Sequence, residues 1–268
     1  MTNSEAKQVA EKAITALITD LEQGHSESLA RYLTAMSRFH RYSWNNVLLI
    51  SLQRASATHV AGFQTWRRFG RYVRKGEKGI VILAPLIGKK RTEDDSDSEE
   101  KHLFGFRAAY VFDVSQTEGE PLPEFATVQG DPAEHTAKLK AFVTEQGISL
   151  DYSDRIRPAL GVSRGGAITL DCGLSPAQEF STLAHELAHE KLHRAERRTQ
   201  TTKTIRETEA EAVAFIVCYA VGLDTNTSSS DYIRLYDGNR ETLTASLDFI
   251  QSTATAILRA ITPEDPLR

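Results

Sequence analysis

The chain of 268 residues contains only two cysteines, Cys172 and Cys218, which are too few for a disulfide scaffold. It also lacks any run approaching the roughly 20 consecutive apolar residues of a membrane span, and its first residues show no apolar secretion segment. We therefore expect a protein of the reducing cytoplasm that does not enter a membrane. A net charge of -4 does not indicate a nucleic-acid binder, so any basic surface must be a local one.

What the chain does contain is a stretch, Ser181–Glu190, in which two imidazoles and a carboxylate have the spacing H-E-x-x-H. Residues four apart lie on one face of a helix, so His185 and His189 can hold one metal ion between them. Glu186 then lies beside that ion, where a carboxylate can act as a general base. The pattern is typical of zinc-dependent peptidases, and it also arises by chance on helices rich in histidine and glutamate.

The residues around this motif favour a buried helix that begins just before it. Ser175-Pro-Ala-Gln178 is the pattern of an N-cap, a proline at the first helical position and a capping-box glutamine. The flanking apolar side chains would bury the helix, and a buried histidine pair needs partners. These apolar residues are Phe180, Leu183, Ala184, Leu187, Ala188 and Leu192.

We expect a third metal ligand in residues 206–222, a second buried helix that Gly222 ends. Glu207 and Glu211 share one face of this helix, whereas Glu209 points elsewhere. We assign Glu207 as the ligand and Glu211 as the acceptor that orients a histidine N–H, with Glu211 as the second choice of ligand. The alternative is that the positive end of the helix alone stabilises both carboxylates.

His193 continues the face of the histidine pair, but three residues over two turns span about 12 Å, too far for three ligands of one ion. We expect His193 to support a ligand from behind or to end the helix.

Hydrophobic periodicity predicts an α+β fold with two domains. The first domain, residues 1–125, reads as helices packed on a small antiparallel sheet, with a linker rich in proline and glycine after it. The second domain, residues 130–268, carries the metal motif. Its strand at 166–171 directly precedes the metal helix, and we hypothesise that it binds an extended substrate as an edge strand. The expected elements are helices at 3–23, 26–39, 43–52, 133–146 and 206–222 and strands at 80–85, 104–113, 148–150 and 166–171.

Residues 60–78 interleave aromatic and basic side chains and contain a single acid, Glu77. Aromatic faces stack on bases while cations follow the phosphate backbone, a mixture that suits a single strand. Aromatics spaced three apart are also typical of a helix that packs on a core and has its basic side chains on the solvent-exposed face. Both the DNA-binding and the core-packing interpretation therefore stay open. The aromatics are Phe63, Trp66, Phe69 and Tyr72, and the cations are Arg67, Arg68, Arg71, Arg74, Lys75 and Lys78.

Two polar features outside this stretch have alternative interpretations. Asn45 and Asn46 lie in the first turn of the third helix, where they either satisfy its free N–H groups or contact a phosphate. Residues 88–101 join a basic cluster to an acidic run, as in a solvated hairpin loop. The alternative is an acidic mimic of nucleic acid that covers the basic residues.

Several of these segments, in this order, resemble the plasmid antirestriction proteins of the ArdC type. The resemblance rests on residues 42–50, 60–66, 70–80, Pro85 and 111–113 together with the metal motif. It implies an N-terminal domain that binds single-stranded DNA and a C-terminal gluzincin-like zinc metallopeptidase domain with one zinc ion per chain. The acidic loop 92–100 departs from the family pattern and leaves the reach of the DNA surface open.

By resemblance, the metal ligands fall on His185, His189 and a glutamate of 207–211, and the catalytic glutamate falls on Glu186. Tyr232 resembles a family tyrosine that would stabilise an oxyanion, although a tyrosine that packs between helices explains it as well. DNA contacts are expected at Asn45, Trp66, Arg67, Arg71, Arg74, Lys75 and Lys78.

The resemblance further implies that the protein protects incoming mobile DNA from host restriction during conjugation. Its partners would be single-stranded DNA and a protein substrate that the sequence does not identify. The competing hypothesis is a non-catalytic protein that sheathes single-stranded DNA and has a structural zinc site.

Overall fold

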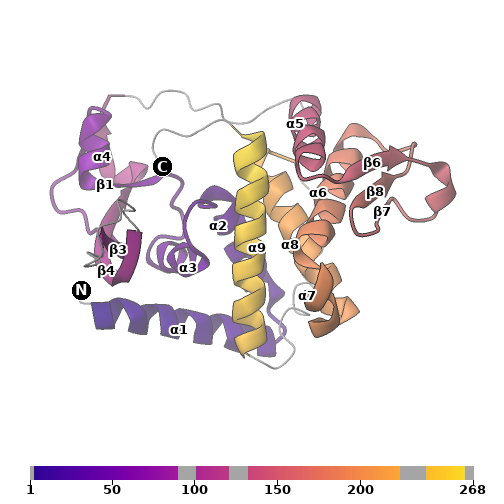
Figure 1. Ribbon diagram of the computed structural model, residues 1–268. Coiled ribbons are helices and arrows are strands. Elements are labelled where there is room, and N and C mark those ends of the chain that lie inside the picture. The colour runs from indigo at the N-terminus through magenta and orange to yellow at the C-terminus, as the bar shows by residue number, and fades with distance from the viewer. Residues whose placement is uncertain (1–2, 90–100, 121–131, 224–239, 263–268) are drawn as a thin grey trace, which may run out of the picture. The chain divides into compact units, whose positions relative to one another are not determined.

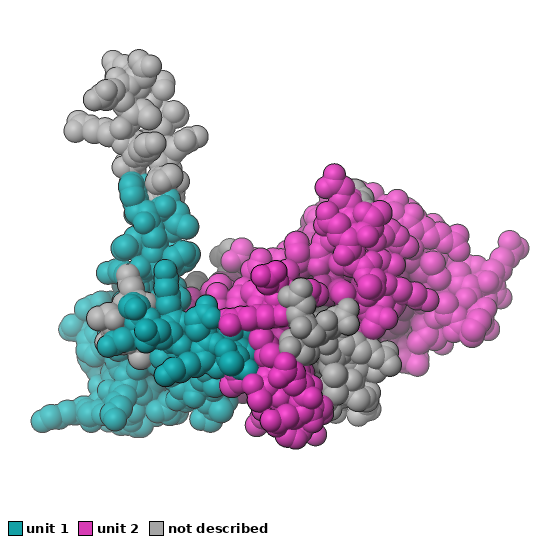
Figure 2. Space-filling view, turned by 90° about the horizontal axis from the view of Figure 1, so that it is seen from below, with its two compact units in different colours: residues 1–15, 48–121, 267 teal, residues 16–47, 122–266, 268 magenta. Residues whose placement is uncertain are grey.

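The computed structural model describes residues 3–89, 101–120, 132–223 and 240–262 (Figure 1). The chain forms two compact units, which Figure 2 colours separately. Unit 1 consists of residues 1–15, 48–121 and 267, and unit 2 consists of residues 16–47, 122–266 and 268. The helices α1 (Asn3–Glu22) and α3 (Trp44–Gln53) each contribute residues to both units.

Unit 1 is built on a three-stranded antiparallel sheet in the order β1-β4-β3. The long strands β3 (Ile80–Lys89) and β4 (Lys101–Asp113) pair along their length, and β1 (Val60–Gly62) pairs with the end of β4. This outcome confirms the predicted small antiparallel sheet. A second ladder joins β2 (Arg71–Val73) to β5 (Thr117–Gly119), with the helix α4 (Phe63–Arg68) between β1 and β2.

The ribbon formed by β3 and β4 changes character along its length. Near β1 the ribbon buries Ile80, Val81 and Val111, whereas most side chains toward its other end are exposed. Figure 2 shows a narrow teal column standing out from the rest of unit 1. The exposed apolar side chains of the ribbon are Leu86, Ile87, Leu103, Phe104, Phe106 and Tyr110.

Asp113 ties the end of β4 to the chain before β1. Its carboxylate accepts hydrogen bonds from the backbone N–H groups of Thr58 at 2.8 Å and His59 at 3.2 Å. It also caps the short helix η1 (Val114–Gln116), because it accepts from the N–H of Ser115 at 2.9 Å. One buried carboxylate therefore accepts hydrogen bonds from three backbone N–H groups that are not paired within a sheet.

Unit 2 is a helical bundle with a small sheet at one side (Figure 1). The helix α8 packs against α6, α9 and α2, and α5 packs against α6 and α9. The bounds are Ser26–Arg38 for α2, Pro132–Glu145 for α5, Pro176–Leu192 for α6, Lys203–Ala220 for α8 and Arg240–Ile261 for α9. Because α2 packs on α8, unit 2 includes residues 16–47, and the division predicted at residues 125–130 stays a prediction.

The sheet of unit 2 has the order β6-β8-β7, with β6 (Ser149–Tyr152) parallel and β7 (Gly161–Ser163) antiparallel to β8 (Ala167–Leu170). The strand expected to bind substrate at 166–171 is β8. It is paired on both sides and has no open edge, so the hypothesis that it is an edge strand is wrong. The strand that packs on α6 from the edge of this sheet is β7.

Two short helices complete the described elements, η2 (Asp154–Ile156) after β6 and α7 (Ala195–Gln200) between α6 and α8. Within the described ranges, no helix has the length and apolar character needed to cross a membrane.

Candidate metal centre and nucleic-acid surface

The helix α6 begins where the sequence predicted it. Ser175 and Gln178 form a capping box around Pro176, and the apolar positions of the helix are buried. Its C-cap is His193, whose backbone N–H donates to the carbonyl of His189 at 2.9 Å. The burial fixes the rotation of α6 and turns His185 and His189 toward α8.

Three side chains from α6 and α8 converge on one point. The Nε2 atoms of His185 and His189 are 3.1 Å apart, and Oε2 of Glu207 lies 3.7 Å from the first and 3.5 Å from the second. Together they form a group of potential metal ligands whose donor atoms lie within 4.8 Å of one another. Ligands about 2.0–2.1 Å from a tetrahedral zinc ion lie roughly 3.3 Å from each other, so these residues fit such an ion.

Glu211 lies one turn after Glu207 and contacts the other side of His185. The Nδ1–H of His185 donates to Oε2 of Glu211 at 3.2 Å. This bond turns Nε2 of His185 toward the point of convergence, where a metal ion that replaced the Nε2 hydrogen would meet the lone pair that metal sites require of a histidine ligand. Glu207 and Glu211 therefore occupy different positions around one histidine.

The carboxylates control the charge of the histidine pair. Burial alone would lower the pKa of His185, but Glu207 and Glu211 outweigh it and raise that pKa to about 9. Burial and the charge of His185 lower the pKa of His189 to about 4. The imidazolium of His185 lowers the pKa of Glu207 to about 2. The two carboxylates thus favour positive charge at the point of convergence.

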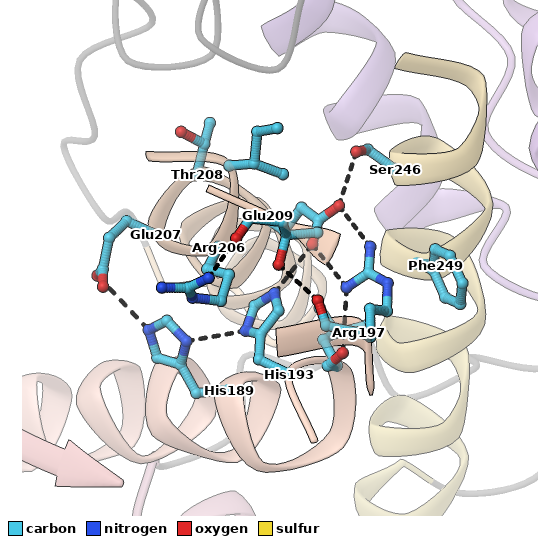
Figure 3. Close-up of polar contacts among 12 residues, drawn as sticks. His189, His193, Arg197, Arg206, Glu207, Thr208, Glu209, Ser246 and Phe249 are labelled. Atoms are coloured by element: carbon cyan, nitrogen blue, oxygen red, sulfur yellow. Dashed lines mark hydrogen bonds and ion pairs between the residues drawn. The ribbon is translucent and has the colours of Figure 1, made fainter. Parts of the chain in front are cut away.

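Behind His189 lies a second, buried polar cluster (Figure 3). His193 contacts Nδ1 of His189 through its own Nδ1 at 2.9 Å and Oε2 of Glu209 through its Nε2 at 2.9 Å. The side chains of His193 and Glu209 have no exposed surface. Burial tends to raise the pKa of Glu209, but donors from His193, Arg197 and Ser246 reverse this and lower it. His193 thus both ends α6 and contacts His189 from behind.

Glu186 lies next to Gly161 and Ser163 of β7. Burial raises the pKa of its carboxyl group, although Ser163 donates to it from both side chain and backbone. Gly161 is the point of closest approach, since a Cβ there would lie 2.6 Å from Cγ2 of Thr182 and 2.9 Å from Oε1 of Glu186. Only glycine permits the strand to lie this near to the carboxylate.

A second glutamate of α6, Glu190, holds the turn between β7 and β8. Its carboxylate accepts from the N–H groups of Gly165 and Gly166, each at 2.7 Å, and from Arg194 at 3.1 Å. The same helix therefore carries the histidine pair and fixes the strand next to Glu186.

Of the residues predicted to contact DNA, Trp66 has a different role. Its side chain has 0% exposed surface, and its indole N–H donates to the carbonyl of Phe112 at 2.9 Å. The prediction that Trp66 contacts DNA is therefore wrong, because a side chain in the core of unit 1 offers no face to a base.

The predicted cations divide into two groups. Arg71 donates to Oγ1 of Thr117 at 2.8 Å and to the carbonyl of Glu120, and Arg74 donates to Oε1 of Glu77 at 3.0 Å, so both tie strands and turns of unit 1 together. Arg67, Lys75 and Lys78 occupy exposed positions, as does Arg74 despite its bond to Glu77, and Asn45 is partly buried in the first turn of α3.

The exposed aromatic side chains of β4 were missed by the sequence analysis. Phe106 is 45% exposed and Tyr110 is 49% exposed, and residues four apart on an uninterrupted strand share a face. The available signal was the alternation of 104–113, which the analysis used only to predict a strand. Two further predictions, the oxyanion role of Tyr232 and the acidic loop 92–100, fall outside the described residues.

Two family models match the chain, one in each half. The N-terminal domain of the anti-restriction factor ArdC matches residues 7–112. The IrrE N-terminal-like domain of the Peptidase_M78 model matches residues 143–223, which include α6 and α8. The predicted resemblance to ArdC-type proteins is confirmed.

The chain is also similar to two solved structures and to one curated relative. The Mn(II)-bound crystal structure of the antirestriction ArdC protein from plasmid R388 has a TM-score of 0.56 at 18% identity and covers 96% of this chain and 99% of that one. Its metal-free structure has a TM-score of 0.51 at 20% identity and covers 81% and 84%. The TM-scores show a shared fold and, at identities below 25%, the fold alone. An uncharacterized protein of Bacillus anthracis is 23% identical over 97% of this chain, which spans about half, 52%, of that relative.

Proposed function

We propose that the chain, which matches the model of the ArdC N-terminal domain at residues 7–112 and the IrrE N-terminal-like domain model at residues 143–223, is an antirestriction protein that protects incoming mobile DNA from host restriction. In this proposal unit 1 binds single-stranded DNA. Unit 2 is a gluzincin-like peptidase domain that holds one zinc ion and cleaves a protein substrate.

The observation that carries the metal proposal is the convergence of the two Nε2 atoms and one Glu207 oxygen, at mutual distances of 3.1–3.7 Å. We assign His185, His189 and Glu207 as the ligands, and Glu211 as the acceptor that orients His185. Two imidazoles and a carboxylate suit zinc and other divalent ions, and the Mn(II)-bound relative is consistent with such an ion. The side chain of Glu207 is 53% exposed, which supports a site that a substrate can reach.

When bound, the metal supplies a Lewis acid that polarises a peptide carbonyl. Glu186 then acts as the general base that takes a proton from the attacking water and delivers it to the leaving amine. A raised pKa suits both steps, because the carboxyl group must take up and release a proton within one turnover. The hydrogen bonds from Ser163 keep this carboxylate beside β7.

We propose that β7 binds the substrate as an extended strand. Because β7 lies at the edge of its sheet and packs on α6, an added strand would run past Glu186. The close approach of Gly161 to Glu186 supports this position for the scissile bond.

The exposed aromatic residues Phe106 and Tyr110 support the proposal that unit 1 binds a single strand. Bases stack on aromatic faces with little regard to sequence, and exposed cations follow the backbone. Candidate cations at exposed positions are Arg67, Lys75 and Lys78. Asn45 belongs to unit 2, where it is partly buried in the first turn of α3, so it is not among the candidates on unit 1.

The substitution Glu186→Gln tests whether catalysis is the mechanism. We expect it to bind zinc like the wild type, because Glu186 is not among the assigned ligands, and to lose protection in a conjugation assay that compares restricting with non-restricting recipients. Glu196→Gln, an exposed glutamate on α7, is the matched control and should protect fully. Full protection by Glu186→Gln would favour the alternative, a non-catalytic protein that sheathes single-stranded DNA and has a structural zinc site.

A further inference from the structure

In the cluster behind His189, the hydrogen-bond partners determine which nitrogen of each histidine carries a hydrogen. Glu209 accepts two hydrogen bonds from Arg197, at 2.8 and 2.6 Å, and one from the hydroxyl of Ser246 at 2.6 Å. A carboxylate that accepts from a guanidinium is ionised and has no proton to give. The nitrogen of His193 that faces it, Nε2, must therefore carry the hydrogen of their 2.9 Å contact.

The same reasoning places the next proton. A neutral imidazole with its hydrogen on Nε2 has a lone pair on Nδ1. Nδ1 of His193 lies 2.9 Å from Nδ1 of His189, so His189 is the donor in that contact (Figure 3). The hydrogen of His189 then lies on Nδ1, and its Nε2 lone pair faces Glu207 and His185.

We propose that His193 and Glu209 are positioning residues that hold His189 in the tautomer able to bind a metal ion. The proposal rests on the proposed metal site and deepens it. His185 receives the same support from Glu211, which lies in a partly exposed position, whereas His189 depends on a relay through a second histidine. The opposite arrangement would make His193 a cation next to Arg197 and place a hydrogen on Nε2 of His189, where it would block a ligand bond.

The surroundings of Glu209 explain how the relay keeps its geometry. Arg197 lies over the ring of Phe249 at 3.8 Å from the centroid, and Ser246 belongs to the same helix, α9. The contacts of α9 and α7 thus fix the carboxylate, which fixes His193 and through it His189. A buried polar network of this kind is rigid only when all its members are satisfied, and each member here has a partner.

The test uses the full chain, first freed of metal with a chelator. Long-range ¹H–¹⁵N spectra of the histidine rings report which nitrogen carries the hydrogen. We expect wild-type His189 as the Nδ1–H tautomer, and a mixture in His193→Leu, which removes the acceptor. His193→Asn should restore the wild-type tautomer, because its amide oxygen can occupy about the place of Nδ1.

The second readout is zinc affinity, measured by competition with a chromophoric chelator. We expect His193→Leu to bind zinc about 10–100-fold more weakly, the usual loss when a ligand's outer partner is removed, and His193→Asn to bind close to wild type. Leu258→Ala, a buried position elsewhere on α9, is the control for lost stability. It should lower the melting temperature and leave zinc affinity unchanged.

The outcomes separate this proposal from the one it rests on. A wild type that binds no zinc would refute the proposed metal site, and this proposal with it. A wild type that binds zinc, together with His193→Leu of equal affinity or a wild-type His189 that carries its hydrogen on Nε2, would overturn only the positioning role.

Discussion

In unit 2 the residues predicted from the sequence to form a site lie together, whereas in unit 1 a residue predicted to lie on the binding surface is buried. In unit 2 the H-E-x-x-H motif and the glutamates of α8 face one another at hydrogen-bond distances. In unit 1 Trp66, which was predicted to stack on bases, lies in the core, and the exposed aromatics include Phe63, Tyr72 and, on β4, Phe104, Phe106 and Tyr110. A metal site is built from short-range helical spacing, whereas a binding surface depends on which face of an element the fold leaves exposed.

The largest expected effect tests the core role of Trp66. Trp66→Ala should lower the free energy of unfolding by about 3–5 kcal/mol, because it removes a fully buried indole and its hydrogen bond. Urea denaturation followed by circular dichroism measures this loss. Tyr110→Ala, at an exposed position, should stay within roughly 0.5 kcal/mol of wild type. Similar losses in the free energy of unfolding for Trp66→Ala and Tyr110→Ala would contradict the assignment of Trp66 to the core and Tyr110 to the surface.

The next effect concerns Asp113. Asp113→Asn should destabilise unit 1 by about 1–3 kcal/mol, because the ionised carboxylate accepts from Thr58, His59 and Ser115. These hydrogen bonds outweigh burial and lower its pKa, so its stabilising contribution is present above the unfolded value near 4 and is lost as pH falls through the folded value. Denaturation curves at pH 7 and at acid pH check this.

The free energy of unfolding of wild type should exceed that of Asp113→Asn by less at acid pH than at pH 7. A difference between the two proteins that stays constant with pH would contradict the assignment of an ionised Asp113.

An effect of similar size, on DNA binding and not on stability, tests the exposed face of β4. Phe106→Ala and Tyr110→Ala should each weaken binding of a labelled oligothymidine by about 1–3 kcal/mol, the usual loss of one stacked base, with unfolding curves like wild type. Fluorescence anisotropy measures the affinity. Leu103→Ala, an exposed aliphatic residue of the same strand, is the matched control and should change affinity little. Equal losses for all three would indicate a general apolar contact in place of stacking.

The smallest expected effect separates the two groups of cations. Arg67→Gln and Lys78→Gln should each reduce the slope of log affinity against log salt by about 1 while unit 1 stays folded, because these positions are exposed. Arg71→Gln should mainly reduce stability, since it loses its bonds to Thr117 and Glu120. Unchanged salt slopes for Arg67→Gln and Lys78→Gln would remove both residues from the DNA surface.

The local elements of the site could be predicted from the sequence because their signals are local. Ser175 and Gln178 form the expected capping box, and Gly222 follows the C-cap of α8 with a φ of 77°. The helix α8 begins earlier than expected, since Thr202 accepts from the N–H of Ile205 at 3.2 Å and adds a turn. The spacing of Glu207 and Glu211 on one face survives this change.

The long-range contacts could not be predicted from the sequence. Nothing in the spacing of α8 indicates that Glu209 meets Arg197 of α7 and Ser246 of α9, residues 12 and 37 positions away. Burial of Trp66 likewise depends on β4, which lies 46 positions further along the chain at Phe112. Partners this distant are brought together only by the tertiary fold.

The central claim is that unit 2 holds one divalent ion between His185, His189 and Glu207, and metal content tests it most directly. We would measure zinc per chain by elemental analysis in the purified wild type and in His185→Ala, Glu207→Ala and Glu211→Ala, each confirmed as folded by circular dichroism. We predict one zinc per wild-type chain, its loss in His185→Ala and Glu207→Ala, and partial retention in Glu211→Ala. Absence of metal from folded wild type after incubation with zinc, or its loss with Glu211 and not with Glu207, would contradict this assignment.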